Sequence, residues 1–333
     1  MNKTAIYHVC LSSHKEVMFR SPEDFRIAFN CLATAALSTN SRLLADGFMT
    51  THYHVLVQTT SLKEFVRRTR YAYARYFNTK NHRTGRLGEE RYFNLVIDGH
   101  HHSIAALNYV IRQGLHHGVA TTPFEYPYCS AGAYFRQELG RFITPPLMKD
   151  HNRHRYLPSN VKIPTNYRMS ADGQLLREDI LDVTWVEQAY VTPKNFLFQM
   201  GKFADAKDIQ NQKEENQLPP VTMETIEAGV PGFSLSEAEA FERSKGNPRA
   251  MTDLELCAYI DTQLLPKSLR QQPAATSQPA ASIYLLSQPE RAKLANWIWR
   301  KSREDLYQKG SADSPFANKT VTEPQLRRCL ALD

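Results

Sequence analysis

The chain has 333 residues, a formal net charge of +7, 42% hydrophobic residues and a mean hydropathy of −0.49. This is the composition of an ordinary globular protein, and the lack of any apolar run near ~18 residues excludes a membrane span. Residues 1–150 hold 18 Lys or Arg and 11 Asp or Glu, whereas residues 151–333 hold 23 of each. The excess positive charge therefore belongs to the first half, which also contains ten of the twelve histidines.

The N-terminus lacks a charged stretch followed by an apolar segment and a cleavage site, so we expect a cytoplasmic protein with no membrane partner. The five cysteines are odd in number and none forms a CxxC pair. This pattern argues against a disulfide framework or a zinc knuckle. We expect the cysteines to be small buried side chains.

The first 60 residues predict a strand, a helix and two further strands. Residues 4–11 (TAIYHVCL) are rich in β-branched and aromatic side chains, which favours a strand. Ser21 and Pro22 suit the N-cap and first position of a helix. Residues 41–49 and 51–58 are two strand-like runs that are close enough in the sequence to pair.

A second helix is predicted from Ser61, with Glu64 as its capping-box partner. Residues 91–98 predict another strand, and residues 101–117 a third helix. The order β-α-β-β-α-β-α predicts an α+β fold, in which a ferredoxin-like antiparallel sheet has its helices on one side.

Beyond residue 145 the pattern changes, and we divide the chain into residues 1–145, 146–232 and 233–333. The polar stretch at 205–232 predicts a linker or a surface excursion. The last part predicts a mostly helical region, in which residues 267–282, rich in Gln, Pro, Ala and Ser, are expected to be disordered. Its helices are predicted at residues 234–245, 252–265, 288–309 and 322–332, and the last two leave open a helix-turn-helix motif.

Four residues form a candidate site. His52 and His54 are two apart in a strand-like run, and a strand directs such residues to one face. They could bind one divalent cation, or they could be two half-buried strand histidines. Tyr109 and Gln113 share one face of the third helix, roughly opposite its apolar stripe. We interpret this pair as a nucleophile beside an oxygen ligand, with a surface tyrosine as the alternative.

These residues resemble the motifs of a known family. His52-Tyr53-His54 is similar to the HUH motif (His, bulky hydrophobic residue, His) of the one-tyrosine HUH transposases. Residues 85–93 (GRLGEERYF) and 107–119 (LNYVIRQGLHHGV) resemble the region after that motif in the REP-associated branch. That branch usually has an Asn-Pro pair where this chain has Gln113-Gly114, which is closer to the insertion-sequence members. The resemblance covers about residues 4–120.

The resemblance implies an HUH catalytic domain that cleaves and rejoins single-stranded DNA with hairpin ends. By position, Tyr109 would be the nucleophile that forms a 5′-phosphotyrosine intermediate, and His52, His54 and Gln113 would bind Mg²⁺ or Mn²⁺. The insertion-sequence members act as dimers, which leaves a homodimer open. Two other functions are compatible with the same residues: a metal-dependent phosphodiesterase without a covalent intermediate, and a non-catalytic regulator that binds DNA or RNA hairpins.

Residues 61–91 carry nine basic and three acidic side chains, interleaved with aromatic residues. Cationic groups bind phosphates and aromatic rings stack on unpaired bases, so this segment predicts a single-strand binding surface; the alternative is a solvated helix face. The candidate DNA-binding residues are Lys63, Arg67, Arg68, Arg70, Arg75, Arg83, Arg86 and Arg91.

Two further groups of histidines flank the tyrosine in the sequence. We interpret His100, His101 and His102 as a surface cluster at the helix start, in preference to a phosphate site. His116 and His117 are interpreted as favourable charges near the helix C-terminus.

Overall fold

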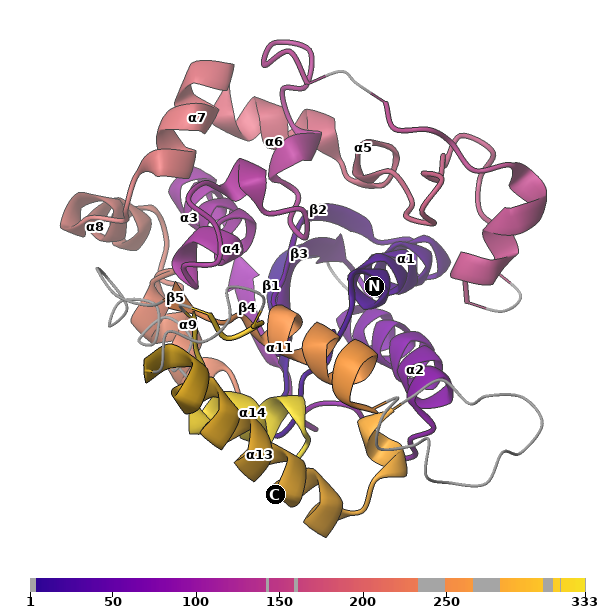
Figure 1. Ribbon diagram of the computed structural model, residues 1–333. Helices are drawn as coiled ribbons and strands as arrows, with labels where there is room; N and C mark the ends of the chain where they lie inside the picture. The colour runs from indigo at the N-terminus through magenta and orange to yellow at the C-terminus, as the bar shows by residue number, and fades with distance from the viewer. Residues whose placement is uncertain are drawn as a thin grey trace.

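The structure, a computed structural model, describes residues 4–141, 144–158, 161–232, 249–265, 282–307, 314–317 and 319–332. Four antiparallel strands form the central sheet (Figure 1). They are β1 (Ala5–Ser12), β2 (Arg42–Phe48), β3 (His52–Thr59) and β4 (Phe93–Ile97), in the spatial order β2-β3-β1-β4. This order, with helices between the strands, is the ferredoxin-like arrangement, so the predicted α+β fold is confirmed.

Helices α1 (Pro22–Ser38) and α2 (Leu62–Asn81) lie on one side of the sheet (Figure 1). Tyr53 of β3 points to this side, where its ring contacts Phe19 and Phe48. Helix α1 begins as predicted after Ser21, whose backbone N–H donates to the Asp24 carboxylate at 2.9 Å.

The prediction of a capping box between Ser61 and Glu64 at the start of α2 was wrong. The Glu64 carboxylate accepts hydrogen bonds from Arg67 and Arg68, which lie on the next turn of the helix. Glu64 therefore does not reach back to Ser61, and the basic side chains of α2 are partly neutralised by their own helix.

The third helix lies on the opposite side of the sheet from α1 and α2, which corrects the prediction of helices on one side (Figure 1). It is also broken at Arg112 into α3 (His100–Ile111) and α4 (Gln113–His116), where a single helix was predicted. The break allows Gly114 to pack on Tyr126 so closely that a Cβ there would lie 2.4 Å from the ring. The segment after the break thus packs against residues that follow it in the chain.

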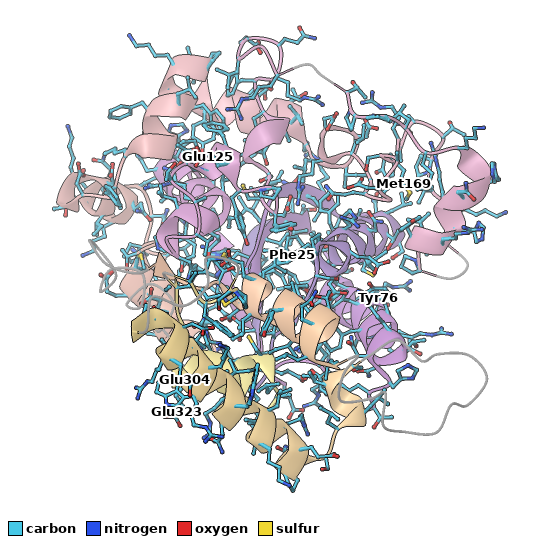
Figure 2. The ribbon with its side chains drawn as sticks, viewed as in Figure 1. Phe25, Tyr76, Glu125, Met169, Glu304 and Glu323 are labelled. Carbon is cyan, nitrogen blue, oxygen red and sulfur yellow. The ribbon has the colours of Figure 1, made fainter. Side chains whose placement is uncertain are left out.

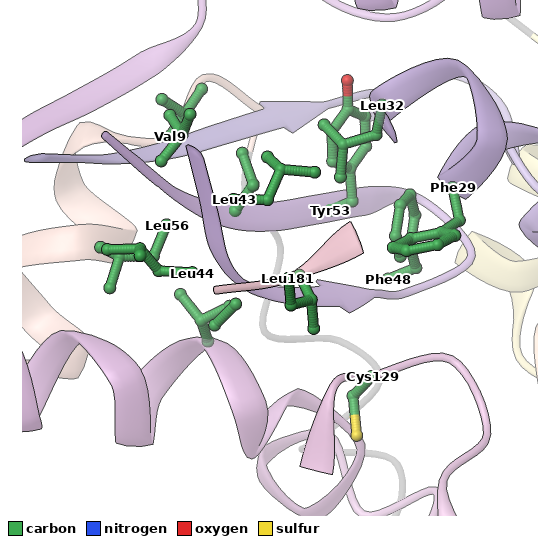
Figure 3. Close-up of a cluster of buried hydrophobic side chains, with 14 of the residues drawn as sticks. Val9, Phe29, Leu32, Leu43, Leu44, Phe48, Tyr53, Leu56, Cys129 and Leu181 are labelled. Carbon is green, nitrogen blue, oxygen red and sulfur yellow. The ribbon is translucent and has the colours of Figure 1, made fainter. Parts of the chain in front are cut away.

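The core around the sheet combines residues from distant parts of the chain (Figure 3). Leu43 and Leu56 from the strands and Phe29 from α1 are 1% exposed or less. Cys129 joins this cluster, and Leu181 does so through a parallel bridge to Leu43. All five cysteines of the chain are buried and unbridged, as expected.

The middle of the chain packs against the sheet domain. Residues 205–232, which were expected to be a linker or a surface excursion, contain two helices, of which α8 contacts α3. Ile226 and Val230 are buried in the same core as the sheet. The elements here are η1 (Pro123–Glu125), η2 (Ala131–Ala133), η3 (Asp150–Tyr156), α5 (Arg177–Ile180), α6 (Val183–Tyr190), α7 (Pro193–Gly201), α8 (Ala206–Glu215) and α9 (Met223–Gly229).

The C-terminal region is mostly helical, as predicted, and has a hydrophobic cluster of its own. Helices α13 and α14 have residues 308–322 between them, not the three- or four-residue turn of a helix-turn-helix motif. Side chains such as Glu304 and Glu323 lie on their outer side, whereas Phe25 lies in the interior (Figure 2). The elements are β5 (Arg249–Ala250), α11 (Asp253–Tyr259), the π-helical η4 (Ile260–Leu264), η5 (Ile283–Leu285), α13 (Gln288–Tyr307), β6 (Lys319–Thr320) and α14 (Glu323–Cys329).

Two predictions in this region fall outside the described residues: the helix at 234–245 and, except for Ser282, the disordered segment at 267–282. Among the helices that the structure describes, none is long and apolar enough to cross a bilayer.

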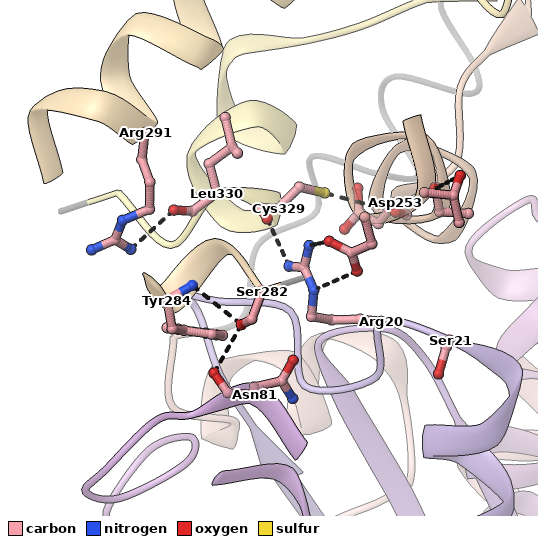
Figure 4. A network of polar contacts seen from close by, with 12 residues as sticks. Arg20, Ser21, Asn81, Asp253, Ser282, Tyr284, Arg291, Cys329 and Leu330 are labelled. Atoms are coloured by element: carbon pink, nitrogen blue, oxygen red, sulfur yellow. Dashed lines mark hydrogen bonds and ion pairs between the residues drawn. The ribbon is translucent and has the colours of Figure 1, made fainter. Parts of the chain in front are cut away.

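Buried polar contacts join the C-terminal region to the sheet domain (Figure 4). The Arg20 guanidinium donates to the Asp261 carboxylate at 2.7 and 3.1 Å and to the Cys329 carbonyl at 2.7 Å. Ser282 donates to the Asn81 carbonyl at 2.8 Å. Because Arg20 is only 3% exposed, these are interior contacts between the two regions.

Candidate functional site

His52 and His54 both point to the face of the sheet that α3 covers, as the strand alternation predicted. The ring of His54 lies 5.2 Å from that of Tyr109, and Nε2 of His52 lies 3.4 Å from Oε1 of Gln113. The centres of the two imidazoles are 5.3 Å apart. Tyr53, between them, points to the opposite core. The sheet thus presents two histidines to the tyrosine helix.

Tyr109 and Gln113 are buried, which excludes the surface tyrosine considered from the sequence. Tyr109 is 7% exposed and Gln113 is fully buried. Although α3 ends before Gln113, the side-chain amide of Gln113 donates to the Tyr109 carbonyl at 2.9 Å. The carboxamide oxygen is left facing His52. The four predicted site residues therefore lie together.

A fifth residue, His8 of β1, belongs to this site and was missed from the sequence. Its Nε2 lies 2.9 Å from Nδ1 of His54, and its ring is 5.5 Å from that of Tyr109. Strand β1 pairs with β3 so that Cys10 is opposite His54, which leaves His8 on the same face. Only the register between the strands could have revealed this neighbour.

His116 and His117 also lie against the site, which corrects their interpretation as charged groups near a helix end. The ring of His117 is 4.9 Å from that of His52, and the ring of His116 is 5.2 Å from that of Tyr109. Burial lowers the pKa of His116 to about 4 and the pKa of His117 well below its ordinary value. Both are therefore neutral near pH 7 and supply no helix-end charge.

Burial sets the protonation of the rest of the site. It lowers the pKa of His52 to about 4 and that of His8 to about 3, and the pKa of His54 falls well below its ordinary value. Burial also raises the pKa of Tyr109 far above its usual range, although a hydrogen bond with Gln113 opposes the shift. The site therefore holds a protonated tyrosine among neutral imidazoles, which is the form of histidine that binds metals.

The residues present suit a divalent cation if Gln113 takes part. Within the described residues, no three His, Cys, Asp or Glu side chains are placed to share one metal ion. His54 has a buried Nε2 without a hydrogen-bond partner, and the Gln113 oxygen lies beside His52. Two imidazoles and a carboxamide oxygen form a mixed donor set: the oxygen suits Mg²⁺ or Mn²⁺, and the imidazoles suit first-row transition-metal ions.

The predicted basic residues lie on the other side of the sheet, on α2 and the loop after it. Arg83 is held inside by Glu16, with nitrogen–oxygen distances of 2.5 and 3.1 Å, so we remove it from the candidate surface. Arg70 is half-buried and donates to the Glu90 carbonyl at 2.8 Å. The others are exposed: Lys63, Arg67, Arg68, Arg75, Arg86 and Arg91.

The histidines at the start of α3 do not form a phosphate site. The Glu215 carboxylate accepts hydrogen bonds from the backbone N–H groups of His100 and His102 and so occupies the helix N-terminus. His100 and His101 are exposed, as expected of a surface cluster, but His102 is fully buried.

Two cavities reach the site from different sides. One, of about 530 Å³, has Tyr109 and His116 in its wall and lies under residues 195–224. The other, of about 330 Å³, is lined by His117 and by residues 250–254 of the C-terminal region. The parts of the chain after residue 145 therefore shape both approaches to the histidines.

No protein-family model and no curated protein matches this chain. Among solved structures, the chain is similar to one described as a REP-associated tyrosine transposase bound to a REP hairpin. The match has 11% sequence identity and a TM-score of 0.32, and it covers 43% of this chain and 83% of that chain. A TM-score of 0.32 does not establish a common fold, so the function must be judged from the site itself.

Proposed function

We propose that this protein is a metal-assisted strand transferase that cleaves and rejoins single-stranded DNA with hairpin ends. The observation that carries the proposal is the enclosure of Tyr109 by His8, His54 and His116, with Gln113 linking the tyrosine to His52. A tyrosine in a hydrophobic core needs no ring of neutral imidazoles, whereas a nucleophile needs both a proton acceptor and a charge stabiliser nearby.

Tyr109 would attack the scissile phosphorus through its hydroxyl oxygen. A bond forms between that oxygen and phosphorus, the bond from phosphorus to the 3′ oxygen breaks, and the leaving strand takes a proton to become a 3′-OH. The product is a 5′-phosphotyrosine, which a second 3′-OH can attack to rejoin strands. Because one phosphodiester replaces another of similar energy, no nucleoside triphosphate is required.

His52, His54 and Gln113 would hold the divalent cation, Mg²⁺ or Mn²⁺. When bound, the cation polarises the phosphate and neutralises developing charge. The residues themselves supply orientation: Gln113 donates through its amide to the Tyr109 carbonyl, which leaves its oxygen toward His52. The neutral ring of His116 beside Tyr109, whose Nε2 has no hydrogen-bond partner, can accept the proton that the hydroxyl loses.

The DNA would reach this site around one end of the sheet. The loop after α2 carries part of the basic surface, and Gly88 in it approaches Ser12 so closely that a Cβ would lie 2.7 Å from the Ser12 carbonyl oxygen. Ser12 is paired with His52 in the sheet. A single strand bound along α2 and this loop would therefore arrive at the His52 end of the site.

The test is a covalent adduct. A labelled hairpin oligonucleotide with single-stranded flanks is incubated with the protein and Mn²⁺, then separated under denaturing conditions. We expect a labelled protein band with the wild type and none with Tyr109→Phe. Tyr167→Phe, at a half-buried tyrosine outside the site, is the matched control and should retain the adduct.

Two other outcomes identify the alternative functions. Cleavage without any adduct would indicate a metal-dependent phosphodiesterase that uses water. Metal-independent binding with neither cleavage nor adduct would indicate a hairpin-binding regulator. Either result would overturn the strand-transferase proposal.

A further inference from the structure

The cavity of about 530 Å³ beside Tyr109 lies between α3 and the segment of residues 195–224. Tyr109, Arg112 and His116 line it on one side, and Phe203 and Lys207 line it on the other. Its volume falls in the range of ordinary small-ligand sites, about 300–1,000 Å³. None of the roles proposed above uses Arg112 or Phe203, although both face this space.

Arg112 places a buried positive charge in the wall of the cavity. The residue is 7% exposed, and its Nε is buried without a hydrogen-bond partner. Its guanidinium donates to the Lys202 carbonyl, but in the part of the chain that the structure describes no carboxylate forms an ion pair with it. Buried charges in proteins are normally paired. The geometry therefore favours an anionic ligand at Arg112.

Phe203 presents an aromatic ring at the mouth of the same cavity. It is 77% exposed, and the Arg112 guanidinium carbon lies 5.4 Å from its ring centroid. An exposed phenylalanine beside a cation is a typical platform for an unpaired base, because the ring can stack on the base while the cation holds a phosphate. Lys207, which is exposed at the rim, adds a further positive charge.

The amide groups of the wall are already ordered. Asn108 donates to the Gln199 carboxamide at 3.1 Å, and the Tyr190 hydroxyl donates to Asn108 at 2.8 Å. This chain of hydrogen bonds fixes polar atoms of α3 and α7 along the cavity, where a base edge would meet them. A ligand that combines one phosphate with one planar, hydrogen-bonding ring satisfies all of these features.

We propose that the cavity binds one nucleotide of the single strand next to the scissile phosphate, with its phosphate on Arg112 and its base stacked on Phe203. This inference rests on the proposed function for the identity of the strand, but it assigns a role to residues 195–224 that the chemistry at Tyr109 does not require. The segment would then select the nucleotide that flanks the cleavage position.

Fluorescence of a base analogue tests the stacking. The probe is octathymidylate with one central 2-aminopurine. The full chain carrying Tyr109→Phe, which cannot cleave the probe, is titrated into it in EDTA. We expect quenching of the 2-aminopurine on binding. Phe203→Ala should abolish most of the quenching and weaken binding roughly tenfold, and Phe203→Trp should restore both.

Phe198→Ala is the matched control, because Phe198 is 61% exposed on α7 but does not line the cavity. It should bind as the parent does. Arg112→Gln should weaken binding and reduce its salt dependence. Binding by Phe203→Ala that equals the parent, or no binding of the probe at all, would overturn the proposal. Competition by free thymidine monophosphate at the same affinity would also overturn it, because the ligand would then be a mononucleotide and not a strand.

The outcomes separate the two proposals. If Tyr109 forms an adduct but Phe203→Ala binds the strand as the parent does, the proposed nucleotide site is wrong and the strand-transferase proposal stands. If Phe203→Ala loses binding but the wild type forms no adduct, the cavity binds a single strand and the strand-transferase proposal is wrong.

Discussion

Nε2 of His8 lies 2.9 Å from Nδ1 of His54 between the sheet and α3, and both rings are fully buried. This contact fixes the orientation of the His54 ring and uses its Nδ1. It leaves Nε2 of His54 as the buried atom without a hydrogen-bond partner. A group that hydrogen-bonds to the second ring nitrogen of a metal-binding histidine fixes the tautomer and the orientation of that ring.

His8→Phe should therefore weaken metal binding without removing a ligand. Loss of a partner that orients a metal ligand typically costs about 10–100-fold in affinity. Titration calorimetry with Mn²⁺ on the Tyr109→Phe background measures this effect. His154→Ala, at an exposed histidine of η3 that is not part of the site, should leave the affinity unchanged. Equal affinities for both variants would mean that His8 does not position His54.

Much of this site could be predicted because it depends on local periodicity. The two-residue step of β3 places His52 and His54 on one face, and the four-residue step from Tyr109 brings Gln113 beside it. These relationships need only the geometry of one strand and one helix. The order of strands and helices up to β4 likewise follows from hydrophobic patterns and helix caps.

The rest depends on contacts between distant segments. His8 joins the site through the β1–β3 register, and directly after the helix break Gly114 packs against Tyr126. The apolar stripe of α3 suggested one buried face, but α3 is covered on one side by the sheet and on the other by α6 and α8. His116 and His117 lie on and just after α4, which contacts β2 and η1, and their burial there lowers the pKa of both. No local pattern encodes these contacts.

Acid should destabilise the metal-free protein below pH 6.5. Burial lowers the pKa of His8 from 6.5 to about 3 and that of His52 to about 4. As the pH falls below 6.5, the unfolded chain binds protons that the folded chain does not, so the free energy of unfolding decreases. Each such histidine contributes up to ~1.4 kcal/mol per pH unit.

Urea unfolding in EDTA between pH 7.5 and pH 5 measures this slope. His8→Phe removes one buried titrating group and should reduce the slope, whereas the exposed His154→Gln should not. An unaltered slope in His8→Phe would show that His8 is not held neutral by burial.

The buried pair of Asp253 and Arg328, on α11 and α14, should stabilise the C-terminal region internally. The two residues are 1% and 8% exposed, and their nitrogen–oxygen distance is 3.1 Å. Arg328→Met leaves a buried carboxylate without its cation, which typically costs about 3–5 kcal/mol. The adjacent Arg327 is half-exposed and lies 3.8 Å from Glu323. Arg327→Met should therefore change the free energy of unfolding by less than about 1 kcal/mol.

The basic residues after His54 fall into two groups, those with exposed side chains that could contact DNA and those held in internal ion pairs. Arg75 is exposed on α2 beside Tyr71, which is 67% exposed, whereas Arg83 is bound to Glu16 and contacts the Tyr284 ring at 5.7 Å. If Arg75 contacts a phosphate, Arg75→Gln should weaken binding to a single strand and reduce the slope of log K against log salt by about 0.7.

Arg83→Gln should act differently, because it removes an internal ion pair and not a surface charge. We expect lower stability with the salt slope unchanged. Filter binding of a labelled single strand between 50 and 200 mM salt distinguishes the two variants. Over this range, phosphate contacts change affinity by roughly 10³–10⁵ for larger sites. A reduced slope in Arg83→Gln and not in Arg75→Gln would contradict this division. The DNA path around the His52 end of the sheet would then need a different surface.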